Sequence, residues 1–225
     1  IGGPACGGKG SLAIQLCVAV ASGTALVDAW HTAAPEPVVY LSAEDDALTI
    51  HRRVHHALEQ LPEDLREQAA ANFYGIPVHG GVNLCRAVGG VVEATANYED
   101  LRDILDAIRP RLLVLDTLAR FSGVDENDNP AMTAFCGLLE GLIDAYGCNI
   151  ILLHHSNKTS GDLIEDPKEL AKALTQTAMR GASALAGCIR WGMLVAPLGA
   201  ALAQKRIGEP ATGKYDGAFL AVRVG

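Results

Sequence analysis

A glycine-rich segment at the start of the chain constrains the fold more than any other feature. Residues 3–9 read Gly-Pro-Ala-Cys-Gly-Gly-Lys, match the first seven positions of the pattern G-x-x-x-x-G-K-S/T, and lead directly into an apolar run. In such a loop, backbone N–H groups surround an anion, and the following helix directs its positive end toward it. We therefore expect a phosphate-binding loop, rather than a turn that only caps a helix, with the residues Gly3, Cys6, Gly7, Gly8, Lys9, Gly10 and Ser11.

One position of this loop departs from the pattern. Gly10 stands where Ser or Thr is usual, and Ser11 follows one place later. The usual hydroxyl holds Mg²⁺ beside the phosphates of a nucleoside triphosphate, whose outer phosphates the lysine, here Lys9, reaches. Either Ser11 or water replaces that hydroxyl, or the metal is held more weakly.

Hydrophobic patterning predicts an α/β fold with a mostly parallel central sheet flanked by helices. Strands are expected at 37–41, 73–78, 112–115, 149–153, 189–195 and 218–224, and helices at 11–22, 48–61, 62–72, 98–108, 130–146 and 168–186, while 80–96 is ambiguous. The length of 225 residues suits one domain, 1–225. Because the chain opens on the loop itself, we expect a fragment that lacks the strand before the loop.

Composition narrows the classes of partner. The net charge of −8 excludes a generic basic nucleic-acid binder, although a local basic surface such as the lining of a ring remains open. Six cysteines without C-x-x-C pairs indicate core thiols in a reducing cytoplasm rather than zinc sites or disulfides. No apolar run reaches the roughly 18 residues of a membrane span, so no membrane partner is expected.

Two carboxylates follow predicted strands. Asp116 ends the apolar run 112–115, where phosphate-loop enzymes place a carboxylate that holds Mg²⁺, often through water; the alternative is an Asp that caps the next turn. Glu44 lies just past the strand 37–41, where a carboxylate can orient the attacking water or accept its proton. The neighbouring Asp45 and Asp46 are interpreted as solvated residues that start the next helix.

Two histidines follow another strand. His154 and His155 come after the apolar run 150–153, and neighbouring parallel strands bring this end to the same sheet edge as Asp116. An imidazole there can hydrogen-bond the γ-phosphate, and because successive residues point to opposite sides, only one of the two is expected to do so. The alternative is a pair of polar residues that simply ends a strand.

Several segments together resemble the RepA-type hexameric replicative helicases of plasmids, which are RecA-like ATPases of the AAA_25 group. They are Gly-Gly-Lys at 7–9, Tyr-Leu-Ser-Ala-Glu-Asp at 40–45, Leu-Asp-Thr-Leu-Ala-Arg-Phe at 115–121 and Leu-His-His-Ser-Asn-Lys at 153–158. The resemblance continues through 179–185 and 189–191, so it spans most of the chain in order. It implies a RecA-like phosphate-loop NTPase that uses ATP and Mg²⁺.

The resemblance also implies a role for each matching residue. Lys9 binds phosphate, Glu44 is the catalytic base, Asp116 is the magnesium carboxylate and His155 is the γ-phosphate sensor. In such rings ATP lies between subunits of a homo-oligomer, typically a hexamer, and basic residues of the neighbouring subunit complete the site. The candidates for these basic residues are Arg180 and Lys214, against the alternatives of a helix-end arginine and a turn lysine.

The expected partner of such a ring is single-stranded DNA. Loops at 121–130 and 156–168 are expected to contact it, but the first contains Asp125, Glu126 and Asp128, which repel a phosphate backbone. Two alternatives therefore remain beside the helicase motor. One is a RecA-like ATPase that acts on protein partners or in recombination without unwinding, and the other is a non-hydrolysing, nucleotide-binding assembly module.

Two further patterns are interpreted as solvated surface. His51 and His55 share a helix face at a spacing that can bind zinc, but no third ligand is evident, and His56 follows directly. The run Asp125 to Asn129 begins like a calcium loop but lacks the Gly and Glu that such a loop requires. The Arg52–Arg53 pair is interpreted as a solvated helix face.

Overall fold

The computed structural model describes residues 1–3, 8–26, 34–80, 82–155, 166, 168, 183–195 and 199. The chain divides into two compact units. The larger unit is Gly10–Leu153, and the smaller unit combines Ile1–Lys9 with His154–Gly225. In the part of the chain that the structure describes, no helix has both the length and the apolar character needed to span a membrane.

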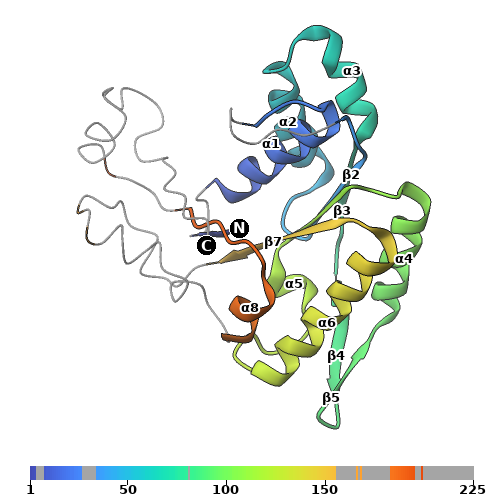
Figure 1. Ribbon diagram of the computed structural model, residues 1–225, viewed down its shortest axis with the longest axis vertical. Coiled ribbons are helices and arrows are strands. Elements are labelled where there is room, and N and C mark those ends of the chain that lie inside the picture. The colour runs from blue at the N-terminus through green and yellow to red at the C-terminus, as the bar shows by residue number, and fades with distance from the viewer. Residues whose placement is uncertain are drawn as a thin grey trace. The chain divides into compact units, whose positions relative to one another are not determined.

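Parallel strands form the sheet of the larger unit (Figure 1). The strands are β2 (Val38–Ser42), β3 (Phe73–Pro77), β6 (Leu112–Asp116) and β7 (Asn149–His155). Every residue of β2 and β6 is buried, as expected for central strands of a parallel sheet that is covered on both faces. In the register of the sheet, Asp116 lies beside Ser42 on one side and beside Leu153 on the other.

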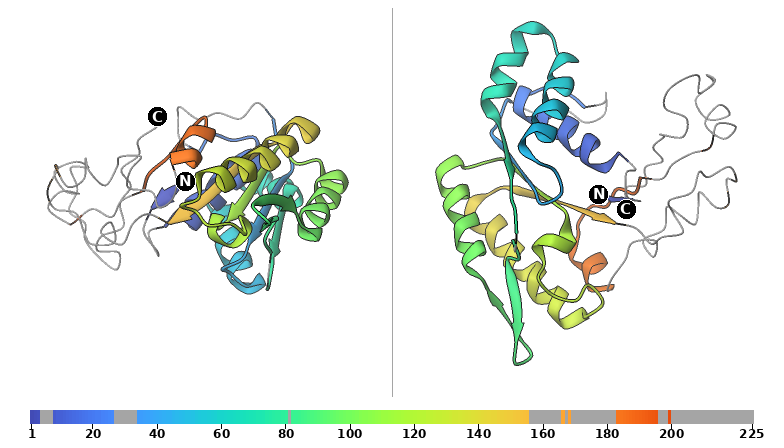
Figure 2. Two further views of the ribbon diagram at one scale, coloured as in Figure 1. Left: turned by 90° about the horizontal axis from the view of Figure 1, so that it is seen from below. Right: turned by 180° about the vertical axis from the view of Figure 1, so that it is seen from behind.

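Helices cover both faces of this sheet (Figures 1 and 2). One face carries α1 (Lys9–Ser22), α2 (Ala47–Glu59) and α3 (Glu63–Asn72), and the other carries α4 (Ala96–Ile108), α5 (Leu118–Phe121) and α6 (Asn129–Tyr146). The chain steps outward from β2 to β3 and then back through β6 to β7. Because parallel crossovers are right-handed, this reversal moves the connecting helices to the opposite face.

The longest helix shows how sequence sets the packing. Helix α6 begins at the Asp128 cap, whose carboxylate accepts a hydrogen bond from the backbone N–H of Ala131 at 3.1 Å, and Pro130 lies in its first turn. It ends at Gly147, which has φ 64°. Between these ends, one stripe at helical spacing packs into the core, formed by Ala131, Met132, Phe135, Cys136, Leu139 and Leu142.

The described cysteines are core residues of the kind expected. Cys17, Cys85, Cys136 and Cys148 are buried, and Cys188 is half-buried. Burial raises the pKa of the Cys85 thiol to about 11, and it also raises the pKa values of Cys17 and Cys148. These thiols therefore stay protonated and unreactive near neutral pH.

The smaller unit contains a short strand before the phosphate loop. Strand β1 (Gly2–Gly3) pairs in parallel with the last two residues of β7, His154 and His155. On its other side, Gly2 bonds to Met193 and Val195, both at 2.8 Å. Two residues of strand therefore lie directly before the segment that is expected to bind phosphate. Hydrogen bonds give the five strands the order β1-β7-β6-β2-β3, and a short helix, α8 (Ser183–Cys188), also belongs to the smaller unit.

Most of the expected elements are confirmed, with four differences. Strand β7 continues through both histidines instead of ending before them. The ambiguous segment 80–96 forms a hairpin of β4 (Cys85–Val88) and β5 (Val91–Ala94), and the short helix α5 was not expected. The expected strand 189–195 is reduced to a single bridge at Leu194. The expected strand 218–224, and most of the expected helix 168–186, lie outside the described residues.

Two glycines with positive φ offer a test of this packing. A Cβ atom at Gly123 (φ 71°) would lie 2.0 Å from the Cys85 carbonyl oxygen, whereas one at Gly147 (φ 64°) would meet nothing within 4 Å. We expect Gly147→Ala to lower the free energy of unfolding by about 1 kcal/mol, from backbone strain alone. Gly123→Ala is expected to cost at least about 2 kcal/mol more, because the backbone must also move. Urea unfolding measures both, and equal losses would contradict the close approach at Gly123.

Candidate functional site

The carboxyl ends of β2 and β6 bring together a group of polar side chains in the larger unit. The backbone N–H of Ala43 donates to the carbonyl oxygen of Asp116 at 2.7 Å, so the turn after β2 starts where β6 ends. We call the group formed by Gly10, Tyr40, Glu44, Asp116 and Thr117 the carboxylate cluster. It contains both carboxylates that the sequence singled out, Glu44 and Asp116.

Asp116 is a buried carboxylate held by a tyrosine. Its side chain is 5% exposed, and its Oδ2 atom accepts a hydrogen bond from the Tyr40 hydroxyl at 2.5 Å. Tyr40 lies beside Val114 and therefore shares a sheet face with Asp116, two residues further along β6. Burial, and then the negative charge of Asp116, raises the pKa of Tyr40, so the phenol remains a proton donor at physiological pH.

Gly10 is the position of α1 that faces this carboxylate. A Cβ atom built on Gly10 would lie 3.5 Å from Asp116 Oδ2, 3.4 Å from the Tyr40 hydroxyl and 3.1 Å from Arg53 Nη1. Ser11 is exposed, and it lies about 100° further around the helix axis than Gly10. The usual Ser/Thr position of the loop thus meets Asp116 without a hydroxyl, and the structure gives that facing position to Gly10 rather than to Ser11.

Glu44 lies at the exposed rim of the same cluster. The Thr117 hydroxyl donates to Glu44 Oε1 at 3.3 Å, which links Glu44 to the residue that follows Asp116. The Ser42 hydroxyl accepts hydrogen bonds from the backbone N–H groups of Glu44 and Asp45, at 3.3 and 3.0 Å. These bonds shape the turn, so Glu44 meets solvent while its backbone is fixed to the end of β2.

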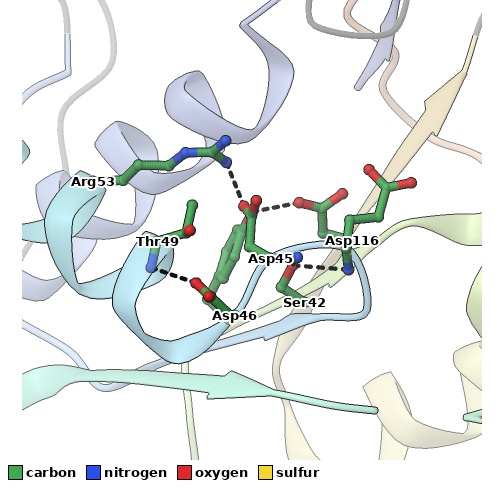
Figure 3. A network of polar contacts seen from close by, with 8 residues as sticks. Ser42, Asp45, Asp46, Thr49, Arg53 and Asp116 are labelled. Atoms are coloured by element: carbon green, nitrogen blue, oxygen red, sulfur yellow. Dashed lines mark hydrogen bonds and ion pairs between the residues drawn. The ribbon is translucent and has the colours of Figure 1, made fainter. Parts of the chain in front are cut away.

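The acidic run after Glu44 has two different roles (Figure 3). Asp46 caps α2 by accepting a hydrogen bond from the Thr49 backbone N–H at 2.7 Å, as expected for a helix start. Asp45 is not simply solvated, because it forms an ion pair with Arg53 from two turns further along α2. Burial raises the pKa of Asp45, and Arg53 opposes that rise.

Arg53, Tyr40 and Thr117 are members of this region that the sequence did not single out as site residues. Arg53 was interpreted as a solvated side chain, but it pairs with Asp45, which lies in the turn before α2, and this contact has no i,i+3 or i,i+4 signal in the sequence. Tyr40 is a hydroxyl-bearing residue in an apolar strand, where a buried hydroxyl requires a partner. Thr117 gave no signal beyond its place after Asp116.

A second cluster lies in the smaller unit and contains Gly3, Lys9 and His155. Lys9 is 6% exposed, its Nζ atom donates to the Gly3 carbonyl oxygen at 3.0 Å, and it lies 3.4 Å from His155 Nδ1. Because an ammonium group has only donors, His155 Nδ1 is the acceptor in this contact. We call this group the lysine cluster.

The same unit explains two features of the sequence. A Cβ atom at Gly3 would lie 2.8 Å from the Val195 carbonyl oxygen and 3.4 Å from Lys9 Cδ, so the close approach requires glycine. Of the two histidines, His155 lies beside Lys9, whereas His154 is buried with 3% exposure. The alternation along β7 therefore separates their surroundings, as expected.

The remaining site candidates lie outside the described residues. These are Cys6, Gly7, Arg180, Lys214 and nearly all of the expected loop 156–168. The other expected loop, at 121–130, is described, and Asp125 and Asp128 are engaged locally. Asp125 accepts a hydrogen bond from the Asn127 backbone N–H at 2.9 Å, and Asp128 caps α6.

The donor set fits a magnesium ion held mainly by phosphate and water. Mg²⁺ typically takes one or two carboxylates from the protein and keeps several waters. Asp116 supplies such a carboxylate, and Gly10 supplies no hydroxyl. Within the described ranges, no group of three or more His, Cys, Asp or Glu side chains is arranged to hold a metal. His51 and His55 stack with ring centroids 6.2 Å apart and are exposed, as the sequence indicated.

The residues of both clusters also lie in a segment that matches a known protein family. A family model, AAA_25, described as an AAA domain, matches residues 1–161. This range is well over half of the chain and includes every described residue of the carboxylate cluster and the lysine cluster.

The Asp46 cap offers a test of how the turn after Glu44 is anchored. Its hydrogen bond with Thr49 lowers the pKa of Asp46, so this stabilisation is complete above the ordinary carboxyl pKa, roughly 3.9, and disappears as pH falls through the lower folded value. We expect Asp46→Ala to be less stable than wild type at pH 7, and the gap to narrow at pH 3. Asp46→Asn keeps the capping oxygen without the charge and serves as the control in urea unfolding. A gap of equal size at both pH values would contradict the charged cap.

Proposed function

The chain belongs to the AAA_25 family of AAA domains, and on this premise we propose that it is the motor of a ring-forming replicative DNA helicase or of a related plasmid or phage replication protein. The family establishes the coarser part of this description, a phosphate-loop NTPase domain that binds nucleotide. The helicase role, the hexameric ring and the cytoplasmic location belong to the proposal. Its support comes from the strand-end residues and from the motifs that surround them.

The observation that carries hydrolysis is the pairing of two carboxylates in contrasting surroundings. Asp116 is buried and bonded to Tyr40, whereas Glu44 is exposed and bonded to Thr117, the next residue after Asp116. Carboxylates in such different environments suit different tasks. The buried one holds the metal and the solvent-facing one orients water, so a hydrolysing enzyme is favoured over a non-hydrolysing assembly module.

Each residue then has one task in ATP hydrolysis. The backbone of the glycine loop and Lys9 would bind the phosphates, and Asp116 would hold Mg²⁺ directly or through water. Mg²⁺ supplies charge neutralisation on the β- and γ-phosphates when bound. Glu44 orients the attacking water toward the γ-phosphate and accepts its proton.

His155 links this chemistry to the rest of the protein. Its Nδ1 atom accepts from Lys9 Nζ, and the γ-phosphate competes for the same ammonium group. Loss of that phosphate after hydrolysis returns the lysine to His155, at the end of β7 and immediately before the loop expected to contact DNA. This connection between the site and the expected DNA-contacting residues would couple ATP hydrolysis to translocation. Arg180 and Lys214 of a neighbouring subunit complete the site. An arginine supplied in this way raises the rate of phosphoryl transfer by about 10³-fold or more.

A second function is favoured by the loop at 121–130. The carboxylates of Asp125 and Asp128 accept hydrogen bonds from the loop backbone and from the first turn of α6, and the loop keeps its negative charge. Acidic residues at a DNA-facing position repel phosphates. An ATPase that acts on a protein partner, or in recombination without unwinding, accommodates this loop better than a DNA motor does.

The roles of Glu44 and Lys9 are separable by experiment. We expect Glu44→Gln to bind ATP as wild type does but to lower the rate of hydrolysis by about 100-fold or more, since the general base is lost. Lys9→Ala is expected to lose ATP binding, because its ammonium group contacts the phosphates. Binding of a fluorescent ATP analogue and phosphate release measure the two steps. Glu63→Gln, a matched change at an exposed glutamate of α3, is the control, and normal turnover in Glu44→Gln would overturn the assignment of the base.

The choice between the two functions rests on the response to DNA. For the helicase motor, we expect single-stranded DNA to stimulate ATP hydrolysis, and the stimulation to weaken as salt rises. Phosphate release is measured with and without an oligonucleotide at two salt concentrations, with Glu44→Gln as the background. Hydrolysis indifferent to DNA would reject the motor in favour of the protein-directed ATPase.

A further inference from the structure

In the carboxylate cluster, the hydroxyl group next to Asp116 comes from β2 rather than from α1. Gly10 occupies the position from which a Ser or Thr hydroxyl holds the metal beside the strand-end aspartate in phosphate-loop enzymes. A Cβ at Gly10 would lie 3.4 Å from the Tyr40 hydroxyl and 3.5 Å from Asp116 Oδ2. The hydroxyl missing from α1 is thus matched by one that arrives from β2, next to the same carboxylate oxygen.

The Tyr40 hydroxyl is well placed to fix that carboxylate. Tyr40 is fully buried in a central strand, so its ring cannot swing away, and its hydroxyl lies 2.5 Å from Asp116 Oδ2. A short hydrogen bond to an ionised acceptor is among the stronger ones in proteins. This hydrogen bond restricts rotation of the Asp116 carboxylate about its side-chain bond. A carboxylate that binds a metal needs such a fixed orientation.

We propose that Tyr40 is a positioning residue whose hydroxyl orients Asp116 for Mg²⁺ in a chain whose glycine at position 10 supplies no hydroxyl of its own. The inference rests on the proposed ATP-binding function and deepens it. Tyr40 acts through Asp116 and touches neither the nucleotide nor the metal. Its effect is therefore confined to the part of nucleotide affinity that depends on Mg²⁺.

The two positions are also mutually constrained. A serine at position 10 would bring its Cβ to 3.1 Å from Arg53 Nη1, which is the far end of a flexible, partly exposed side chain and can shift. Its hydroxyl, one bond beyond that Cβ, can then reach Asp116 Oδ2. The serine hydroxyl would then bond the carboxylate oxygen that Tyr40 bonds, so Gly10→Ser is expected to make Tyr40 dispensable for orienting Asp116.

The test is a double-mutant cycle read by nucleotide binding rather than by turnover. The affinity for a fluorescent ATP analogue is measured with Mg²⁺ and with EDTA, for wild type, Tyr40→Phe, Gly10→Ser and the double variant. We expect Tyr40→Phe to reduce the gain in affinity from Mg²⁺ by about tenfold, the size of a hydrogen bond to a charged group, with affinity in EDTA unchanged. The double variant is expected to recover most of that gain. Tyr74→Phe, at a tyrosine of β3 that is 41% exposed, is the matched control and changes neither affinity.

The outcomes separate this inference from the function beneath it. A Tyr40→Phe protein that keeps the full Mg²⁺ effect overturns the role of Tyr40, while ATP binding by wild type still stands. Equal loss of affinity with and without Mg²⁺, unrelieved by Gly10→Ser, overturns it as well, because Tyr40 then only supports the fold. A wild-type protein that binds no ATP overturns both. Thermal melting of each variant confirms that the comparison is made between folded proteins.

Discussion

The in-register pairing of β2 with β6 determines where the carboxylate cluster forms. Ser42 lies beside Asp116, so the turn that carries Glu44 leaves its strand at the level where Asp116 ends the neighbouring strand. Side chains alternate across a sheet, and a slip of one residue would send Asp116 to the opposite face from Tyr40. The complete burial of both strands makes such a slip costly, because it would also exchange their apolar residues between faces. Packing of an apolar core thereby fixes the geometry of a polar site.

The two carboxylates of this cluster illustrate how environment divides roles. Asp116 has lost nearly all contact with water and relies on protein donors, among them the Tyr40 hydroxyl. Glu44 keeps its access to water, while its backbone N–H and its Oε1 atom are anchored. A phosphate-loop ATPase needs both kinds of carboxylate, one held still and one in touch with the attacking water. In the proposed function, Asp116 and Glu44 would supply them from the ends of adjacent strands.

Sequence reasoning was sound where a pattern has a local physical cause. The strands β2 and β6 followed from continuous apolar runs, α1 from the glycine loop before it, and α6 from Pro130 in its first turn. The expected alternation of the two histidines along their strand agrees with their different surroundings, although the contact of His155 with Lys9 and the burial of His154 were not predicted. The chain start shows a limit of sequence reasoning, since two glycines carry no strand signal and form β1 because β7 and the segment at 193–195 offer hydrogen bonds.

The contacts that could not be predicted from the sequence join segments that are distant in the chain. Tyr40 and Asp116 are 76 positions apart, and nothing in either segment alone reveals their hydrogen bond. The same holds for Thr117 with Glu44, and for Arg53, whose guanidinium lies where a side chain at Gly10 would point. Such contacts depend on strand order, which the sequence suggested only as a class of fold.

The buried thiols give this chain a built-in reporter of its own motion. Cys17 lies inside α1, Cys85 in the hairpin strand β4, and Cys148 just before β7, and burial keeps all three protonated and shielded. A thiol reagent can reach them only when the surrounding element opens, so the rate of labelling at each cysteine records the local opening free energy there. The three cysteines therefore report local opening separately for the helix after the phosphate loop, for the hairpin and for the start of the strand that bears the histidines.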